Sequence, residues 1–241
     1  MIVQKFLASD EAHYQLQDYL DKAYSSFIDS MSGVFNLKRQ DIHKLNIIEG
    51  GYLARGRIVI HNKEFKIEIE EFYGNETFAC CEQCWERWLL TRTEILSHEV
   101  GHHLHIYANE EYWLRRAFEK RNGGITKKTW FLGELVAEIS SLFYFDHFGL
   151  LEKIIDYKRN VGYNDYQNVD EAAFQLFSKP FSKSEFLQLV HSSVDECSSL
   201  LNYYLPFIEK GYSVSLEDYF STCVCPKIPH HLRQLEFDFN D

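Results

Sequence analysis

The sequence lacks the long apolar segments that membrane-spanning and exported proteins carry. Nowhere do about eighteen uncharged apolar residues follow one another, which is the length that a spanning helix needs. The first residues, MIVQKFLASDEAHYQL, carry charges every few positions and contain no apolar core of a signal peptide. We therefore expect a cytoplasmic protein with no membrane partner.

Positive charge is also in short supply. The chain has 25 Lys and Arg residues against 36 Asp and Glu residues, which gives a formal net charge of -11. Proteins bind nucleic acid mainly by neutralising phosphates with Lys and Arg, so this balance disfavours nucleic acid as a direct partner. The excess of acidic residues otherwise predicts no more than a well-solvated surface.

Linkers and repeats are missing as well. Only four prolines interrupt the 241 residues, and no internal repeat, low-complexity stretch or shift in composition marks a domain boundary. A chain of this length can bury one large core. We expect a single domain, residues 1–241, with its core at about 50–150, an N-terminal helix and a C-terminal helical extension.

Hydrophobic periodicity predicts a mostly helical chain with a small sheet. Apolar and charged residues alternate in 65–70, and with the apolar run at 58–60 this pattern predicts two strands joined by a short turn. Spacings of three and four predict helices at 9–31, 84–108, 113–120, 129–148, 170–177 and 183–210. The expected fold class is α+β, predominantly helical, with a small antiparallel sheet in the N-terminal half packed on the helix 84–108.

One short motif in the helix 84–108 carries chemistry. His98, Glu99 and His102 form an H-E-x-x-H sequence. Residues four apart share one face of a helix, so both imidazoles could reach one zinc ion through bonds of about 2.0–2.1 Å. Glu99 would lie beside that ion and could take a proton from water as a general base. The competing interpretation is a chance match, because histidine and glutamate are abundant in this chain.

A catalytic zinc site needs a third protein ligand, and Glu134 is the best candidate. It lies in an otherwise apolar helix, in the sequence Glu-Leu-Val-Ala-Glu. Glu138 shares its face and could accept a hydrogen bond from a ligand imidazole, which would fix the tautomer. Gly101 costs about 1 kcal/mol inside a helix and therefore indicates a close helix crossing, for which Ala137 leaves room. The competing interpretation places both glutamates on a solvated face.

The two motifs together resemble a known class of enzymes. A metzincin would have a third histidine six positions after His102, but Ala108 stands there. The sequences HEVGHHLH and ELVAEIS instead resemble the glutamate-zincins, and most of all the ImmA/IrrE-type metallopeptidases. The Glu-x-x-x-Glu spacing that Glu138 creates is similar to that of the anthrax lethal factor catalytic domain. The resemblance covers 95–142, about a fifth of the chain.

The resemblance implies a zincin-like domain with zinc metallopeptidase activity of the glutamate-zincin type. It makes His98, His102 and Glu134 the metal ligands and Glu99 the catalytic residue. The substrate would be a protein or peptide inside the cell, and the ImmA/IrrE type points to a transcriptional regulator. The alternative is a regulatory metal-binding protein that keeps the zincin scaffold without catalysis and acts through protein binding.

The cysteines suggest a second, structural zinc ion. Cys81 and Cys84 precede the motif helix, and Cys223 and Cys225 lie near the end of the sequence, so the four thiolates could bind one ion. The alternative is that these small thiols are simply buried.

Two other features have modest interpretations. His103 and His105 follow His102 by one and three positions, and we expect them to pack against neighbouring residues. The tail 231–239 resembles a short sliding-clamp-binding peptide, although its alternating apolar residues are more typical of a terminal edge strand.

Overall fold

The structure, a computed structural model, describes residues 10–42, 46–50, 56–61, 64–70, 82–161, 167–178 and 181–197. Side chains are described for residues 21–42, 90, 93–159, 169–178 and 181–197. The helices are α2 (Asp10–Met31), the 3-10 turn η1 (Arg39–Asp41), α3 (Glu82–Ala108), α4 (Glu110–Arg121), α5 (Lys127–His147), α6 (Leu151–Val161), α7 (Gln167–Phe177) and α8 (Lys183–His191).

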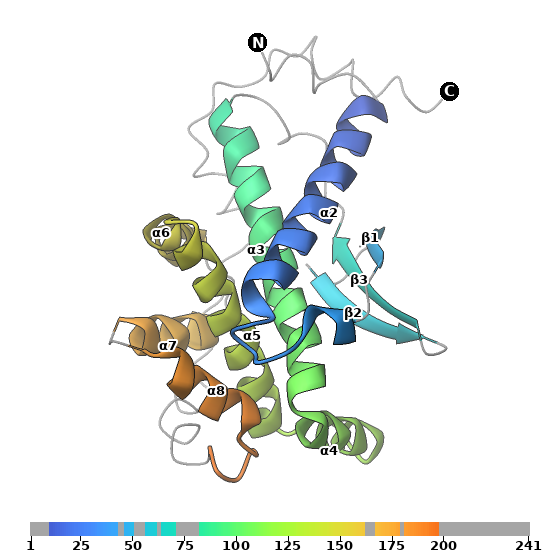
Figure 1. The fold of residues 1–241 in the computed structure, drawn as a ribbon, viewed down its shortest axis with the longest axis vertical. Coiled ribbons are helices and arrows are strands. Elements are labelled where there is room, and N and C mark those ends of the chain that lie inside the picture. The colour runs from blue at the N-terminus through green and yellow to red at the C-terminus, as the bar shows by residue number, and fades with distance from the viewer. Residues whose placement is uncertain are drawn as a thin grey trace.

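Two long helices, α3 and α5, form the centre of the molecule (Figure 1). Helix α2 packs against both of them, α6, α7 and α8 gather along α5, and α4 follows α3 at its C-terminal end. The core comprises side chains from all the helices α2 to α8 and from the segment after α2. Its largest fully buried members are Phe27, Met31, Phe35, Leu96, Leu104, Phe131, Phe145 and Phe186. None of the described helices is both long and apolar enough to cross a membrane.

Helix α5 is apolar on almost every side, and a helix of that kind must be surrounded by other elements. Thr126 begins it as the N-cap, where its side chain accepts a hydrogen bond from the backbone N–H of Thr129. Gly149 ends it in the left-handed region, with φ 68°. The backbone N–H groups of Gly149 and Leu150 donate to Asp146 O and Phe145 O, which satisfies the last carbonyls of the helix.

The prediction of an α+β fold with an antiparallel sheet is wrong. Among the residues whose side chains are described, none lies in a strand, and the fold that they define is mostly helical. The backbone also traces the strands β1 (Asn46–Gly50), β2 (Gly56–His61) and β3 (Glu64–Glu70), in the order β1-β3-β2. Strand β2 is antiparallel to β3, but β1 is parallel to it, so the ladder is mixed. Parallel strands cannot be joined by a tight hairpin turn, so they pair across a longer connection. The alternation of residues within one strand does not show which other strand it pairs with.

Most helix predictions are confirmed, with two exceptions. The helix predicted at 183–210 is wrong at 192–197, where the chain has left the helix and residues 194–197 form a turn. The rest of that prediction, 198–210, lies outside the described residues. Ser182 begins α8 with a capping box that includes Glu185. The second exception is α6, a helix that the sequence analysis did not predict at all.

Candidate metal centre

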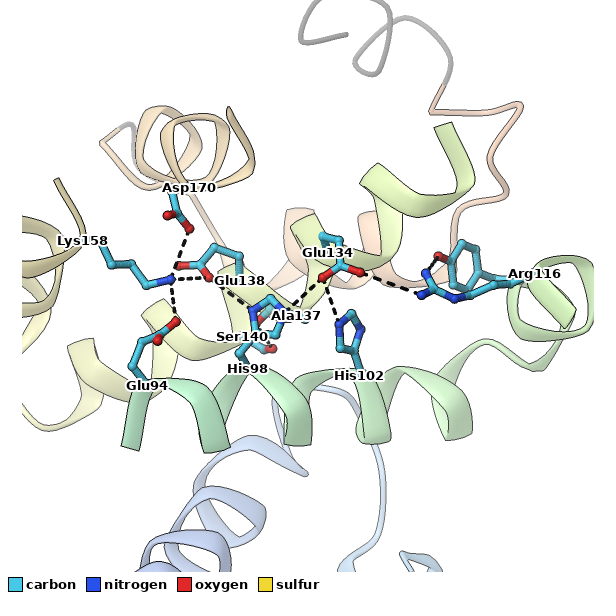
Figure 2. A network of polar contacts seen from close by, with 11 residues as sticks. Glu94, His98, His102, Arg116, Glu134, Ala137, Glu138, Ser140, Lys158 and Asp170 are labelled. Atoms are coloured by element: carbon cyan, nitrogen blue, oxygen red, sulfur yellow. Dashed lines mark hydrogen bonds and ion pairs between the residues drawn. The ribbon is translucent and has the colours of Figure 1, made fainter. Parts of the chain in front are cut away.

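The site lies where α3 and α5 cross, and the crossing depends on Gly101. A Cβ atom added to Gly101 would stand 2.2 Å from Ser140 Oγ and 3.0 Å from both Cα and O of Ala137. Only glycine therefore allows this approach, as the sequence analysis inferred from its cost inside a helix. The close crossing places the buried face of α3, with His98 and His102, directly against the face of α5 that carries Glu134 and Glu138 (Figure 2).

His98, His102 and Glu134 converge on one point. Glu134 Oε2 lies 3.2 Å from Nε2 of His98 and 3.2 Å from Nε2 of His102. The rings of the two histidines, with centroids 4.9 Å apart, are nearly perpendicular to each other. A tetrahedral zinc ion with bonds of about 2.0–2.1 Å holds two ligand atoms about 3.3–3.4 Å apart, close to the separations found here. These three residues and Glu138 are called the His–Glu cluster below.

Each ring nitrogen of His98 faces a carboxylate. Its Nε2 lies near Glu134, and its Nδ1 lies 3.3 Å from Oε2 of Glu138. Burial lowers the pKa of His98, but the hydrogen bonds to Glu134 and Glu138 raise it by more, and the net pKa is well above its ordinary value. Without metal the ring is therefore protonated and bridges both carboxylates. An ion that takes Nε2 must displace that proton, whereas the Nδ1–H donated to Glu138 can stay.

The same contacts hold Glu134 in its ionised form. Burial alone would raise the pKa of this carboxyl, but His102 and His98 lower it well below its usual range. An ionised carboxylate between two imidazole nitrogens is a metal-ligand arrangement that zinc favours. On the outer side, the Arg116 guanidinium approaches Glu134 Oε1, with Nη2 3.9 Å away.

Glu99 lies beside the His–Glu cluster and is itself buried, with 8% of its surface exposed. Burial raises its pKa, and the nearby His102 and His98 lower it only in part, so that the net change is upward. A carboxyl group whose pKa is raised above its ordinary value is better suited to accept and return a proton than an ordinary surface glutamate.

A second group of charges adjoins His98, and the sequence analysis missed it. Lys158 Nζ on α6 lies 2.7 Å from Glu94 Oε1, 2.7 Å from Glu138 Oε2 and 3.2 Å from Asp170 Oδ1 (Figure 2). All four side chains are buried. We call these residues the Lys158 cluster; it shares Glu138 with the His–Glu cluster.

A signal for Lys158 was present in the sequence. In α6 it follows Ile154 by one helical turn, on the side of the helix where Ile154 is fully buried. A lysine that continues an apolar stripe must either extend to solvent or find a carboxylate partner inside. Glu94 gave a similar signal, because it stands one turn before His98 on the same face of α3.

The opposite end of the site is aromatic. Arg116 lies over the ring of Trp113, 5.2 Å from its centroid, and donates a hydrogen bond from Nη1 to the Tyr112 hydroxyl at 3.4 Å. His105 stacks on Tyr112 with centroids 4.7 Å apart. We call these residues the Arg116 end.

The remaining predicted residues have separate outcomes. His105 packs as expected, with its Nε2 3.2 Å from Val190 O, and His103 is fully buried with its ring 5.1 Å from that of Tyr107. The side chains of the predicted thiolate site, at Cys81, Cys84, Cys223 and Cys225, lie outside the described residues, as does the tail 231–239. Those predictions stay untested.

The donor atoms fit a divalent metal ion. Two groups of potential ligands have atoms within 4.8 Å of one another, one formed by His98, His102 and Glu134, the other by Glu94, His98 and Glu138. Five buried carboxyl groups, those of Glu94, Glu99, Glu134, Glu138 and Asp170, lie near the cations of Lys158, Arg116 and the protonated His98. Burial raises the pKa of two of these carboxyl groups, Glu99 and Asp170.

A hollow of about 800 Å³ lies elsewhere, between α2 and the end of α5. Its lining comprises Asp21, Lys22, Ser25, Ser26, Asp29, Ser30, His147 and Phe148. None of the His–Glu cluster residues lines it, so this hollow does not define the candidate site.

Comparison with known proteins adds no assignment. No protein-family model, no curated protein and no solved structure matches this chain. The resemblance to the glutamate-zincins therefore stays a prediction, and the interpretation of the site rests on its own geometry and chemistry.

Proposed function

We propose that this protein is a zinc-dependent metallopeptidase. The observation that carries the proposal is the convergence of His98, His102 and Glu134, with the buried carboxyl of Glu99 next to them. Two imidazoles and one carboxylate form the ligand set of many catalytic zinc sites, which keep a fourth position open for water and substrate.

Each residue has a role in this proposal. Bound zinc would polarise the scissile carbonyl and lower the pKa of water from 15.7 toward about 7. Glu99 accepts the proton of the attacking water and then delivers it to the leaving amine. His98, His102 and Glu134 hold the metal, and Glu138 accepts the Nδ1–H of His98, which keeps Nε2 free to bind.

The substrate class is a peptide bond in a protein or peptide. The motif pair HEVGH and ELVAE supports this assignment, since the zincins that it resembles hydrolyse peptide bonds. The same resemblance makes intracellular regulators of transcription the first substrates to test.

The test separates metal binding from catalysis. Hydrolysis of a mixed peptide library is followed by mass spectrometry. Glu99→Gln should retain zinc but hydrolyse the library at least 10²–10⁴-fold more slowly, which is the contribution of general base catalysis. His98→Ala should lose both, because it removes a ligand. Glu111→Gln changes an exposed glutamate on α4 in the same way and serves as the matched control. Peptide hydrolysis that survives Glu99→Gln at the wild-type rate would refute the proposal.

One observation favours a second candidate, a regulatory metal-binding protein. Less than a tenth of the surface is exposed in each of the four residues His98, Glu99, His102 and Glu134. A substrate could therefore reach them only if the described elements around the site moved apart. If the wild type binds zinc but cleaves nothing in the library, and Glu99→Gln changes no cellular function of the protein, this second function is supported instead.

A further inference from the structure

The Lys158 cluster places a fixed positive charge at one side of the candidate metal centre. Lys158 Nζ is within 3.2 Å of three carboxylates, and 8% of its side chain is exposed. Burial alone would lower the pKa of Lys158, but Asp170, Glu138 and Glu94 raise it well above its usual value. These three contacts therefore favour the ammonium form of the side chain.

This ammonium occupies the place where a second metal ion would otherwise bind. Glu94, His98 and Glu138 present ligand atoms within 4.8 Å of one another. Lys158 Nζ contacts two of these three residues, at 2.7 Å from each carboxylate oxygen. An ammonium at this distance neutralises carboxylates much as an ion would, but its position is fixed by the backbone of α6.

The contact reaches the proposed zinc ligand through a single residue. Oε2 of Glu138 accepts from Lys158 Nζ and also faces Nδ1 of His98, at 3.3 Å. A carboxylate oxygen can only accept at Nδ1, so this contact leaves the lone pair of His98 on Nε2.

We infer that Lys158 is a positioning residue of the metal centre: it holds Glu138 in place, and Glu138 in turn orients His98 toward the ion. The inference rests on the proposed zinc site, and it adds a residue from α6 that contacts neither metal ligand nor substrate. Loss of an outer partner of this kind typically weakens metal binding about 10- to 100-fold.

The experiment is a double-mutant cycle with zinc affinity as the readout. The zinc Kd is measured by competition with a chromophoric chelator for wild type, Lys158→Met, Glu138→Gln and the double variant. Lys153→Met, an exposed lysine on the same helix, is the matched control. We expect Lys158→Met to raise the Kd about 10-fold or more, Lys153→Met to leave it unchanged, and Lys158→Met to add less than threefold once Glu138 is already Gln.

A purely structural role for Lys158 gives a different result. Its effect on the Kd would then add in full to that of Glu138→Gln, and this outcome overturns the inference. An unchanged Kd in Lys158→Met also overturns it. Circular dichroism establishes that each variant is folded. If Lys158→Met does not fold, Lys158→Gln, whose uncharged side chain is one atom too short to reproduce the contact of Nζ with Glu138, is used in the same cycle with the same expectations.

A spectroscopic signature supports the same distinction. In the zinc-bound wild type, ¹⁵N NMR should show His98 with a proton on Nδ1 and zinc on Nε2, and Lys158→Met should shift or broaden the Nδ1–H signal. An identical His98 spectrum in both proteins overturns the inference. A wild type that binds no zinc at His98 and His102 contradicts the proposed function itself, and so the two failures are distinguishable.

Discussion

Two cations flank the His–Glu cluster, and their surroundings differ. Lys158 contacts three carboxylates at 2.7–3.2 Å and is almost fully buried. Arg116 makes one distant contact with Glu134, at 3.9 Å, and 20% of its side chain is exposed. A buried charge without its partner is far more costly than an exposed one. The Lys158 side is therefore the fixed side of the site, and the Arg116 side is the more exposed one.

The difference also concerns what each cation acts on. Lys158 reaches a ligand only through Glu138, so it affects the orientation of His98 (Figure 2). Arg116 faces Oε1 of Glu134, the oxygen that does not contact the histidines, and lies over the Trp113 ring. In the proposed metal site, this contact would leave Oε2 as the oxygen of Glu134 that binds the ion.

Removal of the charge on the fixed side should give the largest loss of stability. Lys158→Met leaves buried carboxylates without their cation, and breaking a buried pair in this way costs about 3–5 kcal/mol in the free energy of unfolding. Urea denaturation of the metal-free protein measures it. The matched control Lys153→Met should change the free energy of unfolding by less than about 0.5 kcal/mol. A loss below about 1 kcal/mol for Lys158→Met would mean that the comparison of the two sides is wrong.

A substitution that pushes α3 away from α5 should destabilise both the Lys158 side and the Arg116 side of the site. In Gly101→Ala the new methyl group meets the backbone of Ala137 at 3.0 Å, and no change of rotamer relieves that contact. Overpacking costs about 3 kcal/mol at the upper end of its usual range, and the better helix propensity of alanine offsets about 1, which leaves a loss of about 2 kcal/mol.

Gly33→Ala is the matched control for that substitution, since nothing lies within 4 Å of the position of its Cβ. Thermal unfolding should show a lower Tm for Gly101→Ala alone. Equal Tm values for the two variants and wild type would show that the helices can separate without cost.

The Arg116 end should lose stability in mild acid. Burial lowers the pKa of His105 to about 3, whereas an unfolded histidine titrates near 6.5. Below pH 6.5 the unfolded chain therefore binds a proton that the folded chain does not, and stability falls as the pH drops toward 3. At pH 5 the expected loss is about 2 kcal/mol, from 1.5 units at 1.36 kcal/mol each.

The measurement compares the free energy of unfolding at pH 7.5 and pH 5 in wild type and in His105→Gln. The difference between the two pH values should shrink by about 2 kcal/mol in His105→Gln. His147→Gln, which changes an exposed histidine, serves as the control. A pH dependence that is the same in His105→Gln and wild type contradicts the assignment.

The smallest effect is expected for the exposed cation. Arg116→Met removes a partly solvated contact at 3.9 Å, and such ion pairs contribute about 0–1 kcal/mol. Both the free energy of unfolding and the zinc Kd should therefore change little, the latter by less than about fivefold. Isothermal titration calorimetry measures the Kd. A larger loss of zinc affinity than in Lys158→Met would reverse the comparison of the two sides.

The sequence predicted part of the site because that part is helical and local. His98 and His102 are one turn apart on α3, and the apolar run around Glu134 on α5 left little choice about its burial. Gly101 even predicted the close crossing. These features follow from a helical period, which can be counted along the chain.

The other features of the fold and the site could not be predicted from a helical period. Helix α6 is short and rich in charged residues, and its contribution depends on Lys158 finding three carboxylates from α3, α5 and α7. Such contacts arise only when the helices are packed. The pairing of β1 with β3 is also non-local, and the end of α8 at His191 depends on the turn that follows it rather than on its apolar pattern.

The close crossing of α3 and α5 at Gly101 has a consequence for the rate at which a metal ion would bind to the proposed site. All residues of the His–Glu cluster project from two helices whose separation is set by backbone contact, so no loop has to become ordered when an ion arrives. The conformational entropy of bringing the donors together is lost during folding, before the ion is present. Association should therefore be governed by ion dehydration and by release of the His98 proton, and only weakly by rearrangement of the chain.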